Sequence, residues 1–421
     1  MTLYPRIPIF LQGVLLGRII IFLLFPFLSA AQDTVRIMTY NLLRYGDNVR
    51  DAHFRTVIQS VRPDILVVQE IDSVRAVPGF LFNVLNANNK EYAVGILRDG
   101  PDSDNAIFYK PAFFLFLENN PIRTALRDIN EFVLKHVQTG RIIRIFGVHL
   151  NAGLEDSLKR AAEADSLRAV TNRLPEGSDF IVVGDFNIYG PDEPAYRKLT
   201  DSGTSRGHAV DPVSITGRWN SATNAIHHTQ STRLRAFAGG AVGGLDDRFD
   251  MILVSPSIRD GEGIRIVPGS YRAFGNDGLH YNDSISRPPN NAVHDSVAHA
   301  LHEASDHLPV VCDLVFDVPV STGKSRSHAS ESVVEIFQVF PHPVPSDPRV
   351  PIRIRFSLRR ESLIQLRMYT LLGQVVWSAD ERLSASGVHD FVWTASRAAG
   401  VYFLELNAGG ERHIKKLVVI P

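Results

Sequence analysis

Residues 179–187 read DFIVVGDFN, an apolar run that ends in a carboxylate at Asp185 and an amide at Asn187. Its consecutive apolar residues are typical of a short strand buried on both faces, as found in layered sheets. A chain that folds for stability alone has little use for an acid at the end of such a strand. The stretch therefore indicates both a sheet-based fold and a place for chemistry.

The same arrangement recurs over the first three quarters of the chain. Five further runs resemble strands: 34–41, 64–70, 141–150, 249–255 and 307–316. The first alternates more than the others, which predicts a place nearer a sheet edge. Apolar residues at helical spacing predict helices over 51–61, ending before Pro63, and over 157–174. Strands that alternate with helices indicate a layered α/β domain.

Nearly every predicted strand of this domain begins or ends with side chains able to bind metal or phosphate. They are Asn41, Glu70, His149, Asp185, Asn187, Asp250, Asp306 and His307. A single polar strand end is usually a cap or a turn former. Eight of these types on successive strands are hard to attribute to capping, and in open α/β sheets ligands bind at strand ends. We therefore expect one site at this edge of the fold.

The residue types indicate hydrolysis of a phosphodiester. Carboxylate and amide oxygens are ligands for Mg²⁺, with Ca²⁺ or Mn²⁺ as alternatives, and do not suit zinc. Asp185 and Asn187 lie two apart and can face one side, so the carboxylate could accept a proton from water while the amide holds that water or a phosphate oxygen. His149 and His307 could donate to phosphate oxygens, given a carboxylate that fixes the tautomer.

Six segments, in this order, resemble the endonuclease/exonuclease/phosphatase superfamily, which includes deoxyribonucleases and sphingomyelinases. They are MTYNLL (38–43), VVQEI (67–71), FGVHL (146–150), VVGDFN (182–187), RFDMILVS (248–255) and SDHLPV (305–310). The resemblance implies a four-layer α/β sandwich, in which two mixed β-sheets pack face to face and are flanked by helices. It also implies a divalent-metal-dependent enzyme that hydrolyses phosphodiester bonds.

The resemblance further implies a role for each polar residue. Asn41 and Glu70 would hold the metal, with Asp306 assisting. Asp185 would activate or orient the attacking water beside Asn187. Asp250 would pair with His307, which would contact the scissile phosphate, and His149 matches the histidine form of its motif.

Other polar residues have two readings. Some abasic-site enzymes carry an acid where this chain has Leu43, which weakens a DNA-repair reading. Four further side chains could contact substrate or could serve packing and ion pairs: Tyr40, Tyr45, Arg160 and Arg248. His299 and His302 lie three apart, as metal ligands on a helix could, but a polar helix that frames the site is the simpler interpretation.

The C-terminal segment has a different character. After a linker at 318–334, alternating runs from 335 to 421 predict a small β-sandwich with a Gly409–Gly410 hairpin turn. Its tryptophans, Trp377 and Trp393, are expected in the core rather than in a sugar platform. The motifs VFPHPV (339–344), TLLGQVVW (370–377) and AAGVYFLELNAGGERHIKKLVV (398–419) resemble the sorting domain of type IX (Por) secretion substrates, which implies the type IX secretion machinery as a partner. An accessory binding module is the alternative.

The N-terminus and the charge constrain location and partners. Residues 1–31 predict a signal peptide, with Arg6 and Arg18 before an apolar core at 19–28 and small residues before Gln32. The core is short for a membrane span, so cleavage is expected rather than stable membrane insertion. From 33 to 317 the chain carries 29 Lys and Arg against 36 Asp and Glu, a net charge of −7, which disfavours tight non-specific binding of DNA.

These observations predict a secreted or cell-surface phosphodiesterase with its catalytic domain at 33–317. Nucleic acid, DNA or RNA, is the favoured substrate, which would make the protein an extracellular nuclease. A phospholipid headgroup, as in a sphingomyelinase, is the second interpretation, and a phosphomonoester is the third. A non-catalytic surface binding protein on the same fold is the alternative of a different class.

Overall fold

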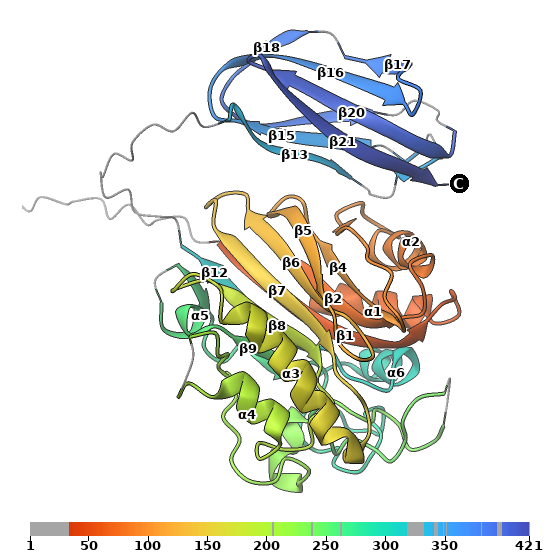
Figure 1. Cartoon of the computed structure of the whole chain (residues 1–421). Coiled ribbons are helices and arrows are strands. Elements are labelled where there is room, and N and C mark those ends of the chain that lie inside the picture. The colour runs from red at the N-terminus through yellow and green to blue at the C-terminus, as the bar shows by residue number, and fades with distance from the viewer. Residues whose placement is uncertain are drawn as a thin grey trace, which may run out of the picture. The chain divides into compact units, whose positions relative to one another are not determined.

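The computed structural model describes ten ranges: 33–203, 206–236, 239–261, 263–317, 332–340, 344–347, 349–350, 352–379, 381–393 and 398–420. The predicted signal peptide and most of the predicted linker lie outside these ranges, so both stay predictions. Helices and strands lie on either side of the gap at 318–331 (Figure 1). Of the helices in the described ranges, none is both long and apolar enough to cross a membrane.

The first sheet has the strand order β10-β12-β1-β2-β4-β3, with β11 also paired to β12. Its strands are β1 (Asp33–Tyr45), β2 (Ile65–Ile71), β3 (Ala93–Val94), β4 (Asp104–Tyr109), β10 (Ile264–Ile266), β11 (Arg272–Ala273) and β12 (Val310–Phe316). The β1–β2 pair is parallel and the other pairs are antiparallel. The sheet is therefore mixed, as predicted.

The second sheet has the order β5-β6-β7-β8-β9. Its strands are β5 (Phe114–Ile122), β6 (Ile129–His136), β7 (Ile142–His149), β8 (Phe180–Asp185) and β9 (Asp250–Val254). Only the β7–β8 pair is parallel in this described sheet. Parallel strands end at the same sheet edge, so β7 and β8 bring their last residues, His149 and Asp185, into register.

Alternating side chains produce the four layers. In β1, Val35 and Ile37 join a core shared by both sheets, whereas Met38 and Tyr40 join the core beneath the helices of the first sheet. Helices α1 (Asp51–Val61) and α6 (Asp295–Ala304) cover the first sheet, and α3 (Ser157–Thr171) and α4 (Pro194–Thr200) cover the second (Figure 1). Shorter helical segments are α2 (Ala76–Gly79), η1 (Phe80–Leu85), η2 (Leu154–Asp156), η3 (Ala222–His227) and α5 (Pro256–Asp260). The architecture is the predicted four-layer α/β sandwich.

The predicted position of the first strand was wrong. β1 lies in the interior of its sheet, between β12 and β2. Its sequence alternates in polarity because the sheet accommodates the charged Arg36. Arg36 Nε and Nη2 donate to the carboxylate of Asp313, on the neighbouring β12, at 2.7 and 2.9 Å. A polar residue on a central strand thus mimics the pattern of an edge.

The C-terminal segment contains two sheets around one apolar core. Their orders are β13-β15-β19 and β14-β21-β20-β16-β17, with β18 paired to β16. The strands are β13 (Val334–Phe340), β14 (Val344–Pro345), β15 (Ile352–Leu358), β16 (Ser362–Thr370), β17 (Val375–Ser378), β18 (Arg382–Ser384), β19 (Gly387–Trp393), β20 (Gly400–Ala408) and β21 (Glu411–Ile420). Gly409 and Gly410 form the β20–β21 turn, Trp393 is buried and Trp377 packs against the core. This is the predicted β-sandwich, and the β14–β21 pair in it is parallel.

Candidate active site

The two sheets direct their polar strand ends to one place. Glu70 is the penultimate residue of β2, and His149 and Asp185 end β7 and β8. Asp250 opens β9 opposite Asp185, because β9 runs antiparallel to β8. Six of the eight predicted residues line one cleft of about 240 Å³: Glu70, His149, Asp185, Asn187, Asp306 and His307. Asn41 and Asp250 lie behind the cleft and bond to residues that line it.

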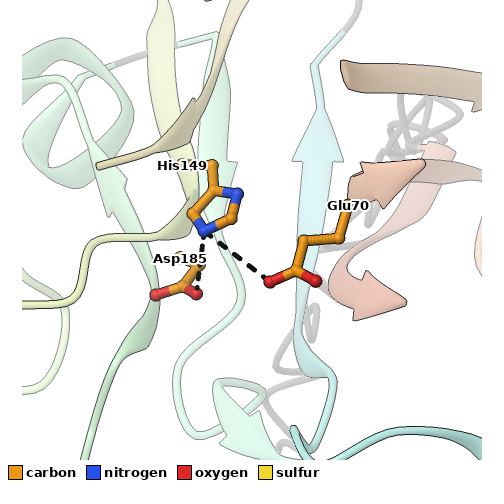
Figure 2. A group of neighbouring side chains, drawn as sticks. All are labelled: Glu70, His149 and Asp185. Carbon is orange, nitrogen blue, oxygen red and sulfur yellow. Dashed lines mark ion pairs between the residues drawn. The ribbon is translucent and has the colours of Figure 1, made fainter. Parts of the chain in front are cut away.

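Glu70, His149 and Asp185 converge on one point, as Figure 2 shows. His149 Nε2 lies 3.8 Å from Glu70 Oε1 and 3.6 Å from Asp185 Oδ2. Asn41 Nδ2 donates to these two carboxylates, to Glu70 Oε1 and Asp185 Oδ2, at 3.0 Å each. The amide oxygen of Asn41 accepts from the Leu43 N–H. Asn41 thus holds the two carboxylates together through its nitrogen.

His307 is fixed from both sides of its ring. Nδ1 lies 2.7 Å from Asp250 Oδ2, and Nε2 lies 2.5 Å from Gln230 Nε2 and 3.8 Å from Asp185 Oδ2. Asp250 is itself held by the turn beside it, because its N–H and that of Phe249 both donate to Thr229 Oγ1. Asp250 therefore fixes the tautomer of His307 and points Nε2 at the cleft.

Backbone geometry at two site residues is unusual. Glu70 and Asn187 have φ values of 58° and 50°, in the left-handed region that non-glycine residues seldom adopt. Asp185 Oδ1 stabilises the second of these turns by accepting from Asn187 N–H at 3.0 Å. Gly184 has φ 141°, and a Cβ there would lie 1.9 Å from Val148 O. Leu43 and Arg44, with φ values of 47° and 48°, line the same cleft, so four such positions occur in one place, and strained positions cluster at functional sites.

Asp306 is held at the cleft by a glycine-rich loop. Its Oδ2 accepts from Ala241 N–H at 2.6 Å, and a Cβ on Gly240 would lie 2.8 Å from Asp306 Cγ. Its Oδ1 is buried and has no hydrogen-bond partner among the described residues. The Oδ1 atom of Asp306 is therefore free to accept a hydrogen bond or to bind a cation.

Burial and crowding of like charges shift the pKa values of the site. Burial raises the pKa of Asp185 to about 7; the neighbouring His307 opposes this rise, and the carboxylates of Asp250 and Glu70 add to it. Burial lowers the pKa of His149 well below 6.5, and Arg127 and His307 lower it further. Burial also lowers the pKa of His307, but the carboxylates around it, Asp250 first, outweigh burial and raise it well above 6.5. His307 is thus the positive partner of several acids.

The donor set fits a divalent cation. Glu70 Oε1, Asp185 Oδ2 and His149 Nε2 all lie within 4.8 Å of one another. Two carboxylate oxygens are hard ligands of the kind that Mg²⁺ prefers, and the solvent-open cleft leaves room for the waters that it retains. Asp306, whose Oδ1 makes no hydrogen bond among the described residues, adds a third carboxylate to the lining of the same cleft.

Several cleft residues were not predicted. Arg44, Ser103, Arg127, Gln230, Gly240 and Ala241 also line it. Arg127 Nε pairs with Asp102 Oδ2 at 2.8 Å, which holds a cation at the rim. The polar stretch at 200–244 had the irregular composition of a binding loop, but nothing in its sequence singled out Gln230.

The residues that the sequence left open between substrate contact and packing make structural contacts. Arg160 pairs with Glu193 at 2.5 Å and Arg248 with Asp211 at 2.7 Å, and both arginines are buried. Tyr45 Oη donates to Asp51, and the ring of Tyr40 packs on Phe54. His299 and His302 lie on α6 and belong to neither group of potential metal ligands found among the described residues.

Comparison with known proteins agrees with this geometry. The family model described as "Endonuclease/Exonuclease/phosphatase family" matches residues 38–307, and "Secretion system C-terminal sorting domain" matches residues 338–420. The second match indicates type IX secretion to the cell surface or the outside. No curated protein matched the chain.

Solved structures similar to this chain include three with different sources. The human Nocturnin catalytic domain with bound sulfate is 19% identical, with a TM-score of 0.42, and the match covers 68% of this chain and 97% of that one. An endonuclease/exonuclease/phosphatase family protein from Bacteroides thetaiotaomicron is 18% identical over 71% and 100% of the chains, with a TM-score of 0.43. D. rerio TDP2 with a single-strand DNA product is 15% identical over 67% and 98%, also with a TM-score of 0.43. On the family match over residues 38–307, the chain belongs to the endonuclease/exonuclease/phosphatase family.

Proposed function

We propose that the protein is a secreted, divalent-metal-dependent phosphodiesterase whose favoured substrate is extracellular nucleic acid. One observation carries the proposal: His307 is oriented by Asp250 at 2.7 Å and aims Nε2 into the cleft that holds Glu70 and Asp185. An oriented imidazole beside paired carboxylates is what attack by water on a phosphodiester requires.

Each side chain has a task in this proposal. Asp185 orients the attacking water and accepts its proton. Asn187 holds the same water or a phosphoryl oxygen. His307 donates from Nε2 to the phosphoryl group, and His149 Nε2 lies 3.6 Å from Asp185 Oδ2. Mg²⁺, with Ca²⁺ or Mn²⁺ as alternatives, would be held by Glu70 and Asp185 with Asp306 nearby, and would supply Lewis-acid stabilisation of the phosphoryl charge.

Charge and surface polarity bear on the substrate class. Arg44 and Arg127 line the cleft and suit a phosphate backbone, although the net charge of −7 over residues 33–317 means that nucleic acid would be held locally. A phospholipid headgroup is the second candidate. Leu154 and Val242 favour it, because they are 65% and 50% exposed and lie within two residues of the cleft-lining Ala152 and Ala241.

The test uses the chain from Gln32 onward with Mg²⁺ or Ca²⁺. It is incubated separately with plasmid DNA, sphingomyelin vesicles and bis(p-nitrophenyl) phosphate. His307→Ala is the inactive variant, and His299→Ala, on α6, is the matched histidine control. Nicking of plasmid by the parent and by His299→Ala, but not by His307→Ala, supports the nuclease. Lipid turnover with intact plasmid moves the protein to the phospholipase class.

A non-catalytic binding protein on this fold makes the opposite forecast. It would leave all three substrates intact under every metal condition. The complete set of acids and histidines in one cleft speaks against it, because a site without catalytic duty has no need to keep Asp185 and Asp250 buried.

A further inference from the structure

Gln230 lies in the cleft on a backbone that is fixed from two sides. Its N–H donates to Asp247 O at 3.1 Å, and its carbonyl accepts from the N–H groups of Asp246 and Asp247 at 2.9 Å. On the other side, Thr229 O accepts from Leu308 N–H at 2.7 Å. The backbone at Gln230 thus acts as a short extra strand between the start of β9 and the approach to β12, which fixes the point from which its side chain extends.

The side chain meets the nitrogen of His307 that faces the cleft. Gln230 Nε2 lies 2.5 Å from His307 Nε2, whereas Nδ1 of the same ring is occupied by Asp250. A ring nitrogen makes one in-plane hydrogen bond. The amide therefore takes the bond that a phosphoryl group would take in the proposed function.

The Gln230 amide has an oxygen that accepts hydrogen bonds and an NH₂ group that donates them. The protonation of His307 Nε2 determines which of the two faces the ring. When His307 Nε2 carries a proton, the oxygen of Gln230 must face it, since two N–H donors repel at 2.5 Å. The amide NH₂ is then directed away from Nε2. The amide can hold the ring in this way as long as no phosphoryl oxygen takes the bond to Nε2.

Resting on the proposed function, we propose that Gln230 is a positioning residue that holds the His307 ring from its Nε2 side until a phosphoryl group replaces it. Asp250 fixes the ring on one side and Gln230 on the other. A phosphodiester that enters must displace the amide from Nε2. Gln230 therefore improves the orientation of His307 in the free enzyme and competes with binding of the phosphoryl group.

This double effect predicts a split between kinetic constants. Gln230→Ala should leave kcat within about twofold, because the phosphoryl group has already replaced the amide in the substrate complex, while KM for bis(p-nitrophenyl) phosphate and the inhibition constant for inorganic phosphate fall about tenfold. Gln230→Glu keeps the length but places a carboxylate on His307, so kcat/KM should fall by about a hundredfold or more. Gln59→Ala, an exposed glutamine on α1, is the control and should change nothing.

A second measurement separates this proposal from the proposed function. Histidine ring nitrogens of ¹⁵N-labelled protein are recorded by NMR without substrate, for the parent, Gln230→Ala and Gln59→Ala. The Nε2 resonance of His307, assigned with His307→Ala, should move in Gln230→Ala alone, with the unfolding temperature unchanged. An unmoved resonance overturns the proposal, and so does a Gln230→Ala variant in which KM rises while kcat is unchanged. A parent enzyme without phosphoesterase activity overturns the proposed function, and the resonance still tests the role of Gln230.

Discussion

Replacing Asp185 by asparagine should stabilise the metal-free protein at alkaline pH while it abolishes hydrolysis. Burial raises the pKa of Asp185 from 3.8 to about 7. The folded state therefore holds the proton more tightly than the unfolded state. Below pH about 4 the carboxyl is protonated in both states and does not affect the free energy of unfolding. As the pH rises from about 4 to 7 the group lowers the free energy of unfolding, and above 7 its full destabilising effect is present.

The size of the effect follows from two opposing contributions. A difference of about three pH units between folded and unfolded states corresponds to about 4 kcal/mol. The substitution also removes the acceptor of the 3.0 Å bond from Asn41, which costs about 1 to 2 kcal/mol. The net gain of about 2 to 3 kcal/mol corresponds to a rise in Tm of about 4 °C for a domain of this size.

The assay is thermal unfolding in EDTA at pH 8 and pH 4, with Asp185→Asn beside the parent. The rise in Tm should vanish or reverse at pH 4. There the parent carboxyl is neutral, so the substitution only removes the hydrogen bond from Asn41. Saturating Mg²⁺ at pH 8 should also reverse the rise in Tm, because the parent alone keeps this ligand. Asp165→Asn, on the exposed face of α3, is the matched control. Equal destabilisation by Asp185→Asn at both pH values would refute the reasoning.

Three further predictions follow from the same geometry. His307→Ala should lower kcat by about 10² to 10⁴ with the fold intact, as measured by hydrolysis and circular dichroism; near-parental turnover would contradict its role. EDTA should abolish hydrolysis, and added Mg²⁺ should restore it, whereas activity that survives chelation would exclude the metal. Gly184→Ala should destabilise the protein by more than about 3 kcal/mol in urea unfolding, because the new Cβ meets Val148 O. Gly190→Ala, where a Cβ meets nothing within 4 Å, is its control.

The sequence predicted the strands that consist mainly of apolar residues and missed strands that carry polar ones. Helix α1 was predicted with its bounds, and the polar ends of β2, β7 and β8 identified the residues that meet in the cleft. Strands β4, β5 and β6 were not predicted, because they carry polar residues such as Asn105, Asn119 and Asn130. These amides bond to one another between strands, with Asn130 Nδ2 donating to Asn119 Oδ1 at 3.2 Å. A single sequence does not display such long-range partners, so a satisfied interior amide resembles a loop residue.

The same limit applies to the loops of the cleft. Gln230 and Ala241 reach His307 and Asp306 across 77 and 65 positions of the chain. Neither residue type has a spacing or periodicity that marks it. Composition predicted that the stretch at 200–244 serves binding, but only the fold determines which of its atoms enter the cleft.

The cleft gathers several carboxylates close together. They are Glu70, Asp185, Asp250 and Asp306, and the last three raise the pKa of His307. Such crowding reduces the stability of the folded chain, and the apolar cores of both sheets must offset it. A divalent cation would relieve the repulsion, so part of its binding free energy is already stored in the folded protein. The carboxylates that make the metal-free site unfavourable are therefore the reason for expecting the cation to bind there, and the Asp185→Asn experiment measures both effects in one protein.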